Sequence, residues 1–272
     1  MNASEIIDQF QNEGYAVAPR LFEADEVEAI KAHFMALNKG GHGYEGDKAT
    51  LLGSDDPLKA YPRLVHPHRF DQVSLDWLLD ARLRGWTTAL LGREPYAAQT
   101  MFYFKPPGAR GQALHQDQKS LRVRPGTCLA AWMAVDDCDE ANGCIQIVPG
   151  TQDLPQLCLI EADLSQSFSS KTVPIPPGKA PVPVLMRAGD VLFFNGQVIH
   201  GSYPNSSQTR FRRALIGHYV VGEAEKVAEF YHPLLNFDGA VVEMKASGQG
   251  GPCGIFADDA EQTIKMVEAK AV

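Results

Sequence analysis

A histidine and an aspartate stand two residues apart in the segment His115-Gln116-Asp117, and this pair could bind a metal ion. On a β-strand, residues i and i+2 point to the same face, so the imidazole and the carboxylate would approach one ion from one side. His200, which ends the apolar run 190–199 and precedes Gly201, is the candidate third ligand. Two histidines and one carboxylate leave three adjacent positions open, an arrangement typical of a non-haem Fe(II) centre that binds a co-substrate and O₂.

These three residues, taken alone, leave other interpretations open. His200 could be a buried, hydrogen-bonded core histidine. A structural zinc site is usually closed by four ligands and often uses cysteine. The chain has five cysteines, without a CxxC pair. We therefore expect neither a disulfide framework nor a thiolate zinc site, and a reduced, cytoplasmic setting.

An arginine strengthens the metal hypothesis. Arg212 lies twelve residues after His200 and opens the strand-like run 212–220. Its planar guanidinium matches a carboxylate in a bidentate pair, so a dicarboxylic acid could chelate the ion at one end and bind arginine at the other. Strand alternation places Arg210 and His218 on the same face as Arg212 and Arg213 on the opposite one. Alternation alone thus leaves Arg210 and Arg212 as candidates, with a surface charge as the other interpretation.

The surrounding elements must bring these residues together. Apolar spacing predicts helices over 5–12, 25–37 and 75–91 and a strand over 15–18, while the Gly-rich, polar residues 42–60 read as a mobile loop. After residue 98 the chain changes to short strands separated by Gly/Pro turns, with a long irregular insertion over 152–181. Such strands indicate a β-sandwich or barrel, on which the N-terminal helices pack. The predicted strands are 101–104, 128–135, 144–148, 182–186, 191–194, 198–200 and 212–220.

Composition limits the class of partner. The chain has 272 residues and a net charge of −8, which argues against long-range attraction to nucleic acid or an anionic membrane. No apolar run approaches the ~18 residues of a membrane span. The opening segment MNASEIIDQF lacks a basic region followed by an apolar one, so we expect no secretory signal. A small-molecule substrate is the expected partner.

Seven segments, in order and at family-like spacing, resemble the phytanoyl-CoA dioxygenase family of Fe(II)/2-oxoglutarate-dependent oxygenases. They cover most of residues 98–220. The segments are TMFYFKPP (100–107), LHQD (114–117), AWMAV (131–135), NGCIQIVPGT (142–151), GDVLFF (189–194), HGS (200–202) and FRRA (211–214).

The resemblance implies a mainly β fold with flanking helices. Its core would be a double-stranded β-helix, a cupin-like jelly roll with the metal at its open mouth. We expect one dioxygenase domain over residues 1–272. It would comprise a helical N-terminal part (about 1–97), the β-helix core (about 98–222) and a C-terminal extension (223–272) in which no family motif can be placed.

The resemblance also assigns site residues. His115, Asp117 and His200 would hold Fe(II), and Arg212, which follows Phe211, would bind the far carboxylate of the co-substrate 2-oxoglutarate. Further co-substrate residues are implied at the positions Ser202, Trp132, Met101, Gln116 and Arg63.

The implied reaction consumes O₂ and 2-oxoglutarate and hydroxylates, or otherwise oxidises, an unactivated C–H bond of a small molecule, with release of succinate and CO₂. Because the ligand Asp117 is intact, halogenation is disfavoured. Two alternatives remain. One is a zinc- or manganese-dependent cupin-like hydrolase or isomerase, which would not need Arg212. The other is a non-catalytic jelly-roll binding protein.

Overall fold

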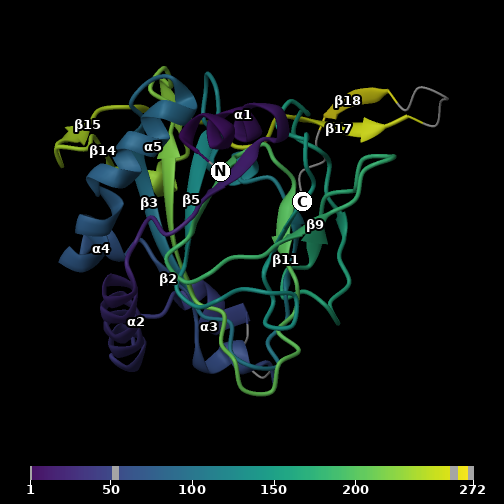
Figure 1. Ribbon diagram of the computed structural model, residues 1–272. Helices are drawn as coiled ribbons and strands as arrows, with labels where there is room; N and C mark the ends of the chain where they lie inside the picture. The colour runs from purple at the N-terminus through teal and green to yellow at the C-terminus, as the bar shows by residue number, and fades with distance from the viewer. Residues whose placement is uncertain (1, 51–54, 258–262, 269–272) are drawn as a thin grey trace.

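Two β-sheets face each other in the computed structural model, which describes residues 2–50, 55–257 and 263–268 (Figure 1). The major sheet has the order β1-β10-β5-β12-β3-β14-β15, with β2 paired to β3, and the minor sheet the order β4-β11-β6-β9. The major strands are β1 (Tyr15–Ala18), β2 (Leu64–Val65), β3 (Tyr96–Tyr103), β5 (Cys128–Ala134), β10 (Val191–Asn195), β12 (Ala214–Val220), β14 (Leu234–Leu235) and β15 (Val241–Val242). The minor strands are β4 (Gln112–His115), β6 (Ile145–Ile147), β9 (Val182–Val184) and β11 (His200–Ser202).

Strand β5 shows why the layers form. All seven of its residues are buried, because both faces of the major sheet are covered. Leu129, Ala131 and Met133 belong to the apolar cluster under the helices, whereas Ala130 and Trp132 belong to the cluster between the two sheets. This alternation defines the predicted double-stranded β-helix, with its interior between the sheets.

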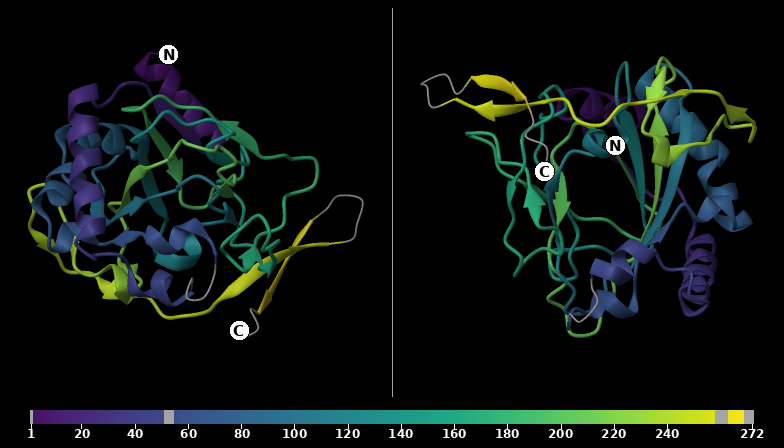
Figure 2. Two further views of the ribbon diagram at one scale, coloured as in Figure 1. Left: turned by 90° about the horizontal axis from the view of Figure 1, so that it is seen from below. Right: turned by 180° about the vertical axis from the view of Figure 1, so that it is seen from behind.

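Helices cover the outer face of the major sheet (Figures 1 and 2). In α2 (Ala24–Lys39), Phe34 stacks on Phe102 of β3 with ring centroids 4.3 Å apart. The helix predicted over 75–91 is two helices, because the side chain of Asp80 accepts a hydrogen bond from the backbone N–H of Arg82 and starts a new one. The helices are α1 (Ala3–Glu13), α2 (Ala24–Lys39), α3 (Glu45–Thr50), α4 (Gln72–Leu78), α5 (Ala81–Leu91) and α6 (Gln118–Leu121), with 3₁₀ turns at Pro57–Ala60, Pro67–Arg69 and Glu229–Tyr231.

Two predicted loops contain regular structure. Residues 42–60 include α3 and a 3₁₀ turn, and positions 51–54 lie outside the described residues. The insertion 152–181 carries a two-stranded ladder of β7 (Ile160–Glu161) and β8 (Lys171–Thr172). The C-terminal extension adds β13 (Lys226–Val227), which pairs with β16 (Lys245–Ala246), and a hairpin of β17 (Pro252–Phe256) and β18 (Ile264–Glu268). No helix among the described residues is long and apolar enough to cross a membrane.

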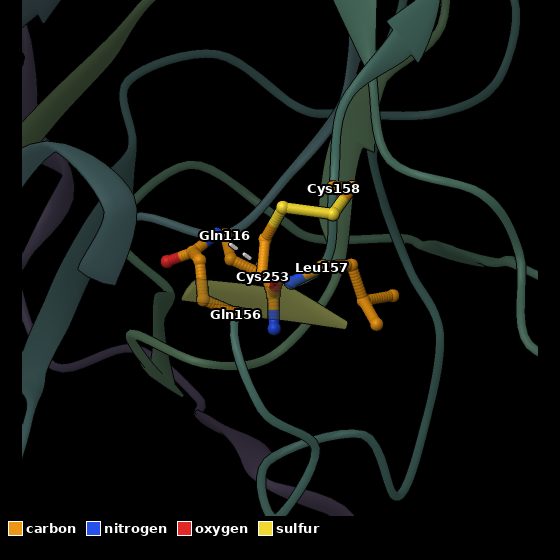
Figure 3. Close-up of a disulfide and its surroundings, with 5 residues drawn as sticks. All are labelled: Gln116, Gln156, Leu157, Cys158 and Cys253. Carbon is orange, nitrogen blue, oxygen red and sulfur yellow. Dashed lines mark hydrogen bonds between the residues drawn. A yellow bond between two sulfur atoms is a disulfide. The ribbon is translucent and has the colours of Figure 1, made fainter. Parts of the chain in front are cut away.

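The expectation of no disulfide framework was wrong for one pair. Cys158 of the insertion is bonded to Cys253 of β17, 95 residues away (Figure 3). Local spacing could not reveal a pair that only the fold brings together. Cysteine usage therefore no longer supports the expected reduced, cytoplasmic setting. The other three cysteines are free and buried.

Candidate metal centre

His115 and His200 lie opposite each other in the minor sheet. His115 ends β4, His200 begins β11, and the two form a register pair between these antiparallel strands. Asp117, in contrast, is not on the strand as predicted. Its φ of −61° and ψ of −31° place it in a helical turn, as the residue before α6. The carboxylate therefore reaches the histidines because the chain turns after His115, and not through strand alternation.

The three side chains converge. One ligand atom from each of His115, Asp117 and His200 lies within 4.8 Å of the others. Nε2 of His115 is 3.4 Å from Oδ1 of Asp117, and Nε2 of His200 is 3.7 Å from Oδ2. The structure thus brings together all three residues that the sequence nominated.

Backbone carbonyls orient both imidazoles. Nδ1 of His115 is 2.9 Å from the carbonyl oxygen of Ala113, and Nδ1 of His200 is 3.0 Å from that of Val198. A carbonyl only accepts, so each ring carries a proton on Nδ1, which leaves Nε2 as the atom that faces Asp117 and a bound cation. This tautomer is the one that a metal-ligating histidine with an Nδ1–H partner adopts.

A third histidine contacts the same carboxylate from the other sheet. Nε2 of His218, on β12, is 3.1 Å from Oδ2 of Asp117. Alternation placed His218 on the face of Arg212 without giving it a role. Its contact fixes the orientation of the carboxylate, as residues around metal ligands commonly do.

The charges favour binding of a divalent cation. Burial alone would raise the pKa of Asp117, but the neighbouring histidines His200, His218 and His115 bring it well below its ordinary value. Burial, together with repulsion from His115, lowers the pKa of His200 to about 4. Burial also acts against the cation of His115, but the neighbouring Asp117 outweighs burial and raises the pKa, so the metal-free site favours a second proton on this ring, which a bound cation would displace. An ionised carboxylate and neutral imidazoles are the ligating forms.

A cavity between the sheets connects the three ligands to Arg212. Met101, Trp132 and Ser202 also line it, as the family resemblance implied, and so does His218. Arg212 is 2% exposed, its Nε donates to the carbonyl of Gly143 at 3.0 Å, and its guanidinium lies over the Trp132 ring, 5.2 Å from the centroid. Burial lowers the pKa of Arg212.

The neighbouring arginines are already paired. Arg210 binds Asp139 through two contacts of 2.8 Å at the surface, and Arg213 binds Asp136. Arg212 forms no ion pair with any residue that the structure describes. Of the two candidates that alternation left open, Arg212 is therefore the one available to a carboxylate in the cavity.

Gln116 does not join this cavity, contrary to its predicted position at the co-substrate. Its side-chain amide donates to the carbonyls of Pro155 and Gln197, and its oxygen accepts from the backbone N–H of Leu157 at 2.8 Å (Figure 3). Strand β4 ends at His115, and the buried side chain of Gln116 points away from the cavity, toward this neighbouring segment. Gln116 therefore anchors the ligand-bearing turn to the segment that leads to the disulfide at Cys158.

Arg63 lies next to the cavity and not in it. Its guanidinium pairs with Asp47 and donates to the hydroxyl of Tyr103 at 3.2 Å. Tyr103 lines the metal cavity and two adjoining ones, and Arg63 lines only the latter two. Its charge is balanced by Asp47, but it shares an adjoining cavity with Arg212 and Ser202, so its role at the co-substrate stays a prediction.

Sequence reasoning assigned no role to Lys105, which lies inside the TMFYFKPP segment. It is 3% exposed, and its ammonium donates to the hydroxyl oxygen of Ser202 at 2.7 Å and to the carbonyls of Gly143 and Tyr203. Burial and the nearby Arg212 lower the pKa of Lys105 well below its ordinary value. A lysine is normally exposed, so only its place in the quoted segment could have drawn attention to it.

The comparisons with known proteins agree with this architecture. The family model for phytanoyl-CoA dioxygenase (PhyH) matches residues 10–214, so the chain belongs to that family. Phytanoyl-CoA dioxygenase 1 of Oryza sativa subsp. japonica is 29% identical over 157 residues, which are 56% of this chain and 54% of the relative. Ectoine dioxygenase of Stutzerimonas stutzeri (strain A1501) is 25% identical over 221 residues, 75% of this chain and 72% of the relative. The match to phytanoyl-CoA dioxygenase of Arabidopsis thaliana covers 57% of that protein, so the chain spans little more than half the length of these plant relatives.

Solved structures share the fold. The non-heme alpha ketoglutarate dependent carbocyclase SnoK from nogalamycin biosynthesis superimposes with a TM-score of 0.67 at 21% identity, covering 82% of this chain and 86% of that chain. EctD from S. alaskensis, crystallised with 2-oxoglutarate and 5-hydroxyectoine, gives 0.60 at 21% identity, covering 81% and 76%. At these identities the likeness establishes the double-stranded β-helix.

Proposed function

We propose that this protein is an Fe(II)- and 2-oxoglutarate-dependent dioxygenase that oxidises an unactivated C–H bond of a small molecule, with release of succinate and CO₂. The observation that carries the proposal is one cavity with two kinds of group. The ligand atoms of His115, Asp117 and His200 converge in it. Arg212, buried and without a carboxylate partner among the described residues, also lines it.

The donor set fits iron. Two neutral imidazole nitrogens and one carboxylate oxygen are the ligands of facial Fe(II) sites, and the carbonyls of Ala113 and Val198 already hold both rings in the ligating tautomer. When bound, Fe(II) with 2-oxoglutarate and O₂ would supply the oxidising chemistry that amino-acid side chains lack.

The chain's own residues supply binding and orientation. Arg212 binds the far carboxylate of the co-substrate, and the Trp132 ring beneath it excludes water from that pair. His218 holds Oδ2 of Asp117. A neighbouring cavity begins at His115 and Asp117 and continues to Gln99 and Tyr231, and this mixture of polar and aromatic groups suits a small organic substrate.

The test is anaerobic titration with Fe(II) and 2-oxoglutarate, followed by the visible charge-transfer band of the chelate and by succinate release in air. His115→Ala and Asp117→Ala are expected to abolish both signals because each removes a ligand. Arg212→Met should raise the 2-oxoglutarate concentration at half-saturation by roughly 30-fold or more, the usual cost of losing a buried charge partner. Arg210→Met, the matched control, should leave it unchanged because Arg210 binds Asp139 at the surface.

Two results would reject the proposal, and a third would assign the far carboxylate to Arg210 instead of Arg212. Metal binding without the band or succinate release would favour the zinc- or manganese-dependent hydrolase or isomerase. Failure to bind any divalent metal would favour a non-catalytic binding protein. A half-saturation shift in Arg210→Met and none in Arg212→Met would move the carboxylate site.

A further inference from the structure

Lys105 is held in one orientation by three acceptors. Its Nζ lies 2.7 Å from Oγ of Ser202, 3.3 Å from the carbonyl oxygen of Gly143 and 2.5 Å from that of Tyr203. Although burial lowers the pKa of Lys105, two of these partners are carbonyl oxygens that only accept, and the ammonium form, with three protons and no lone pair, satisfies all three. Lys105 therefore has no proton left for a ligand, and any effect on ligand binding must pass through its partners or its charge.

Ser202 is the partner that faces the cavity. Its Oγ accepts from Lys105 and also from the backbone N–H of Gln112 at 3.2 Å. A hydroxyl has two lone pairs and one proton, so both acceptor positions are filled and only the proton remains. No hydrogen bond within residues 2–50, 55–257 or 263–268 uses that proton. Ser202 and Arg212 line the same cavity, so Ser202 presents a donor beside the guanidinium.

Lys105 and Arg212 also share an acceptor, so their two positive charges lie close together. The carbonyl of Gly143 accepts from both, and both side chains are at least 97% buried, given exposures of 3% and 2%. Neither forms an ion pair with any described residue. Two buried positive charges without a carboxylate are costly, and an anionic ligand group at Arg212 would offset that cost.

We propose that Lys105 is a positioning residue that locks Ser202 as a hydrogen-bond donor to the far carboxylate of the co-substrate, and that this device makes the cavity select a 2-oxo dicarboxylic acid over a 2-oxo monocarboxylic acid. The inference rests on the proposed function. It assigns Lys105 an indirect role, through the Ser202 hydroxyl and through the positive charge behind it.

The experiment compares two probes that differ in one carboxylate. Binding of 2-oxoglutarate and of 2-oxobutyrate to the Fe(II)-loaded protein is measured by calorimetry without O₂. Lys105→Met and Ser202→Ala should each weaken 2-oxoglutarate binding about tenfold or more, the cost of a lost hydrogen bond to a charged group. Each should leave 2-oxobutyrate binding within about twofold. Lys226→Met, which removes an exposed lysine of β13, should change neither affinity.

The double variant tests whether Lys105 acts through Ser202. The double variant Lys105→Met/Ser202→Ala should have about the same affinity for 2-oxoglutarate as the single variant with the lower affinity. The reason is that both substitutions remove the same hydrogen bond from Ser202 to the far carboxylate. Independent, additive losses would overturn the inference, as would equal losses for the two probes. If Lys105→Met fails to fold, Ser202→Ala decides the matter alone, and an unchanged preference for 2-oxoglutarate overturns the inference. A wild-type protein that binds neither probe would instead refute the proposed function.

Discussion

His68 shows how a single buried residue couples stability to pH. It is 7% exposed, and its Nδ1 accepts from the backbone N–H of Thr100 at 3.2 Å. Protonation of Nδ1 would break this contact and place a charge in the core. Burial, together with Arg69, lowers the pKa of His68 to about 4. The folded protein therefore favours a neutral ring, whereas the unfolded chain protonates near pH 6.5.

We predict that stability falls as the pH drops from about 6.5 toward 4. Only the unfolded chain takes up a proton at His68 in this window, so this residue contributes a slope of up to about 1.4 kcal/mol per pH unit, and its contribution is fully present above the window. His68→Gln should flatten the slope in urea unfolding measured between pH 4.5 and 7. His42→Gln, at an exposed position, is the matched control. A His68→Gln slope equal to that of the wild type would refute this explanation.

At the residue scale, the sequence predicted what residue type and spacing determine. Residue type and spacing nominate His115, Asp117 and His200 as metal ligands, and the family resemblance selects Arg212 over Arg210 for the far carboxylate. Lys105 received no role because a lysine in a sequence indicates an exposed charge, and only three-dimensional contacts reveal its three acceptors. Gln116 lies between two candidate ligands in the sequence, but its buried side chain points away from the cavity and accepts a hydrogen bond from Leu157, which spacing alone could not reveal.

At the scale of elements, the disulfide links the C-terminal hairpin to the metal centre. Cys253 lies on β17 and Cys158 ends the segment that binds Gln116 (Figure 3). Leu157 in this segment is fully buried and forms a bridge with Gly254 of the hairpin. The covalent bond and these contacts together hold the outer side of the turn that carries Asp117.

We predict that Cys253→Ser lowers the free energy of unfolding by about 2–4 kcal/mol, the usual contribution of a disulfide that closes a long loop. Thermal unfolding measures the effect. Cys158→Ser should match Cys253→Ser, and a dithiol reductant should shift only the wild type to the variants' midpoint. A wild-type midpoint that does not respond to full reduction would contradict this prediction.

Strands with a clear apolar pattern were predicted from the sequence, whereas element ends that depend on a turn or a capping residue were not. Strand β1 was predicted at its observed bounds, and β5 to within one residue, because apolar patterning marks them. The single helix over 75–91 ignored the capping aspartate Asp80. The sequence predicted a strand through Asp117, with strand alternation directing its carboxylate toward His115. In the structure the strand ends at His115, and a helical turn brings the carboxylate to the two histidines instead.

At the scale of the molecule, we propose that all three parts of the chain form one cooperative domain. The N-terminal part supplies β1, which pairs with β10, and the C-terminal extension supplies β14, which pairs with β3. Val227 and Leu234 of the extension are fully buried, in one cluster with Cys128 of β5 and Val220 of β12. The extension thus completes a core that the β-helix strands begin.

A pair of truncations tests this proposal. Ending the chain after residue 222 removes several buried apolar side chains, each contributing about 1.5–3 kcal/mol, which together approach the 5–15 kcal/mol of a typical domain. We expect this variant to lose cooperative unfolding in urea, followed by tryptophan fluorescence and circular dichroism. Ending it after Ser247 removes the β17–β18 hairpin and the disulfide but keeps β14 and the buried cluster, so the variant should still unfold in one transition at a lower midpoint. Cooperative unfolding of the shorter variant at the midpoint of the longer one would show that the extension is not part of the domain.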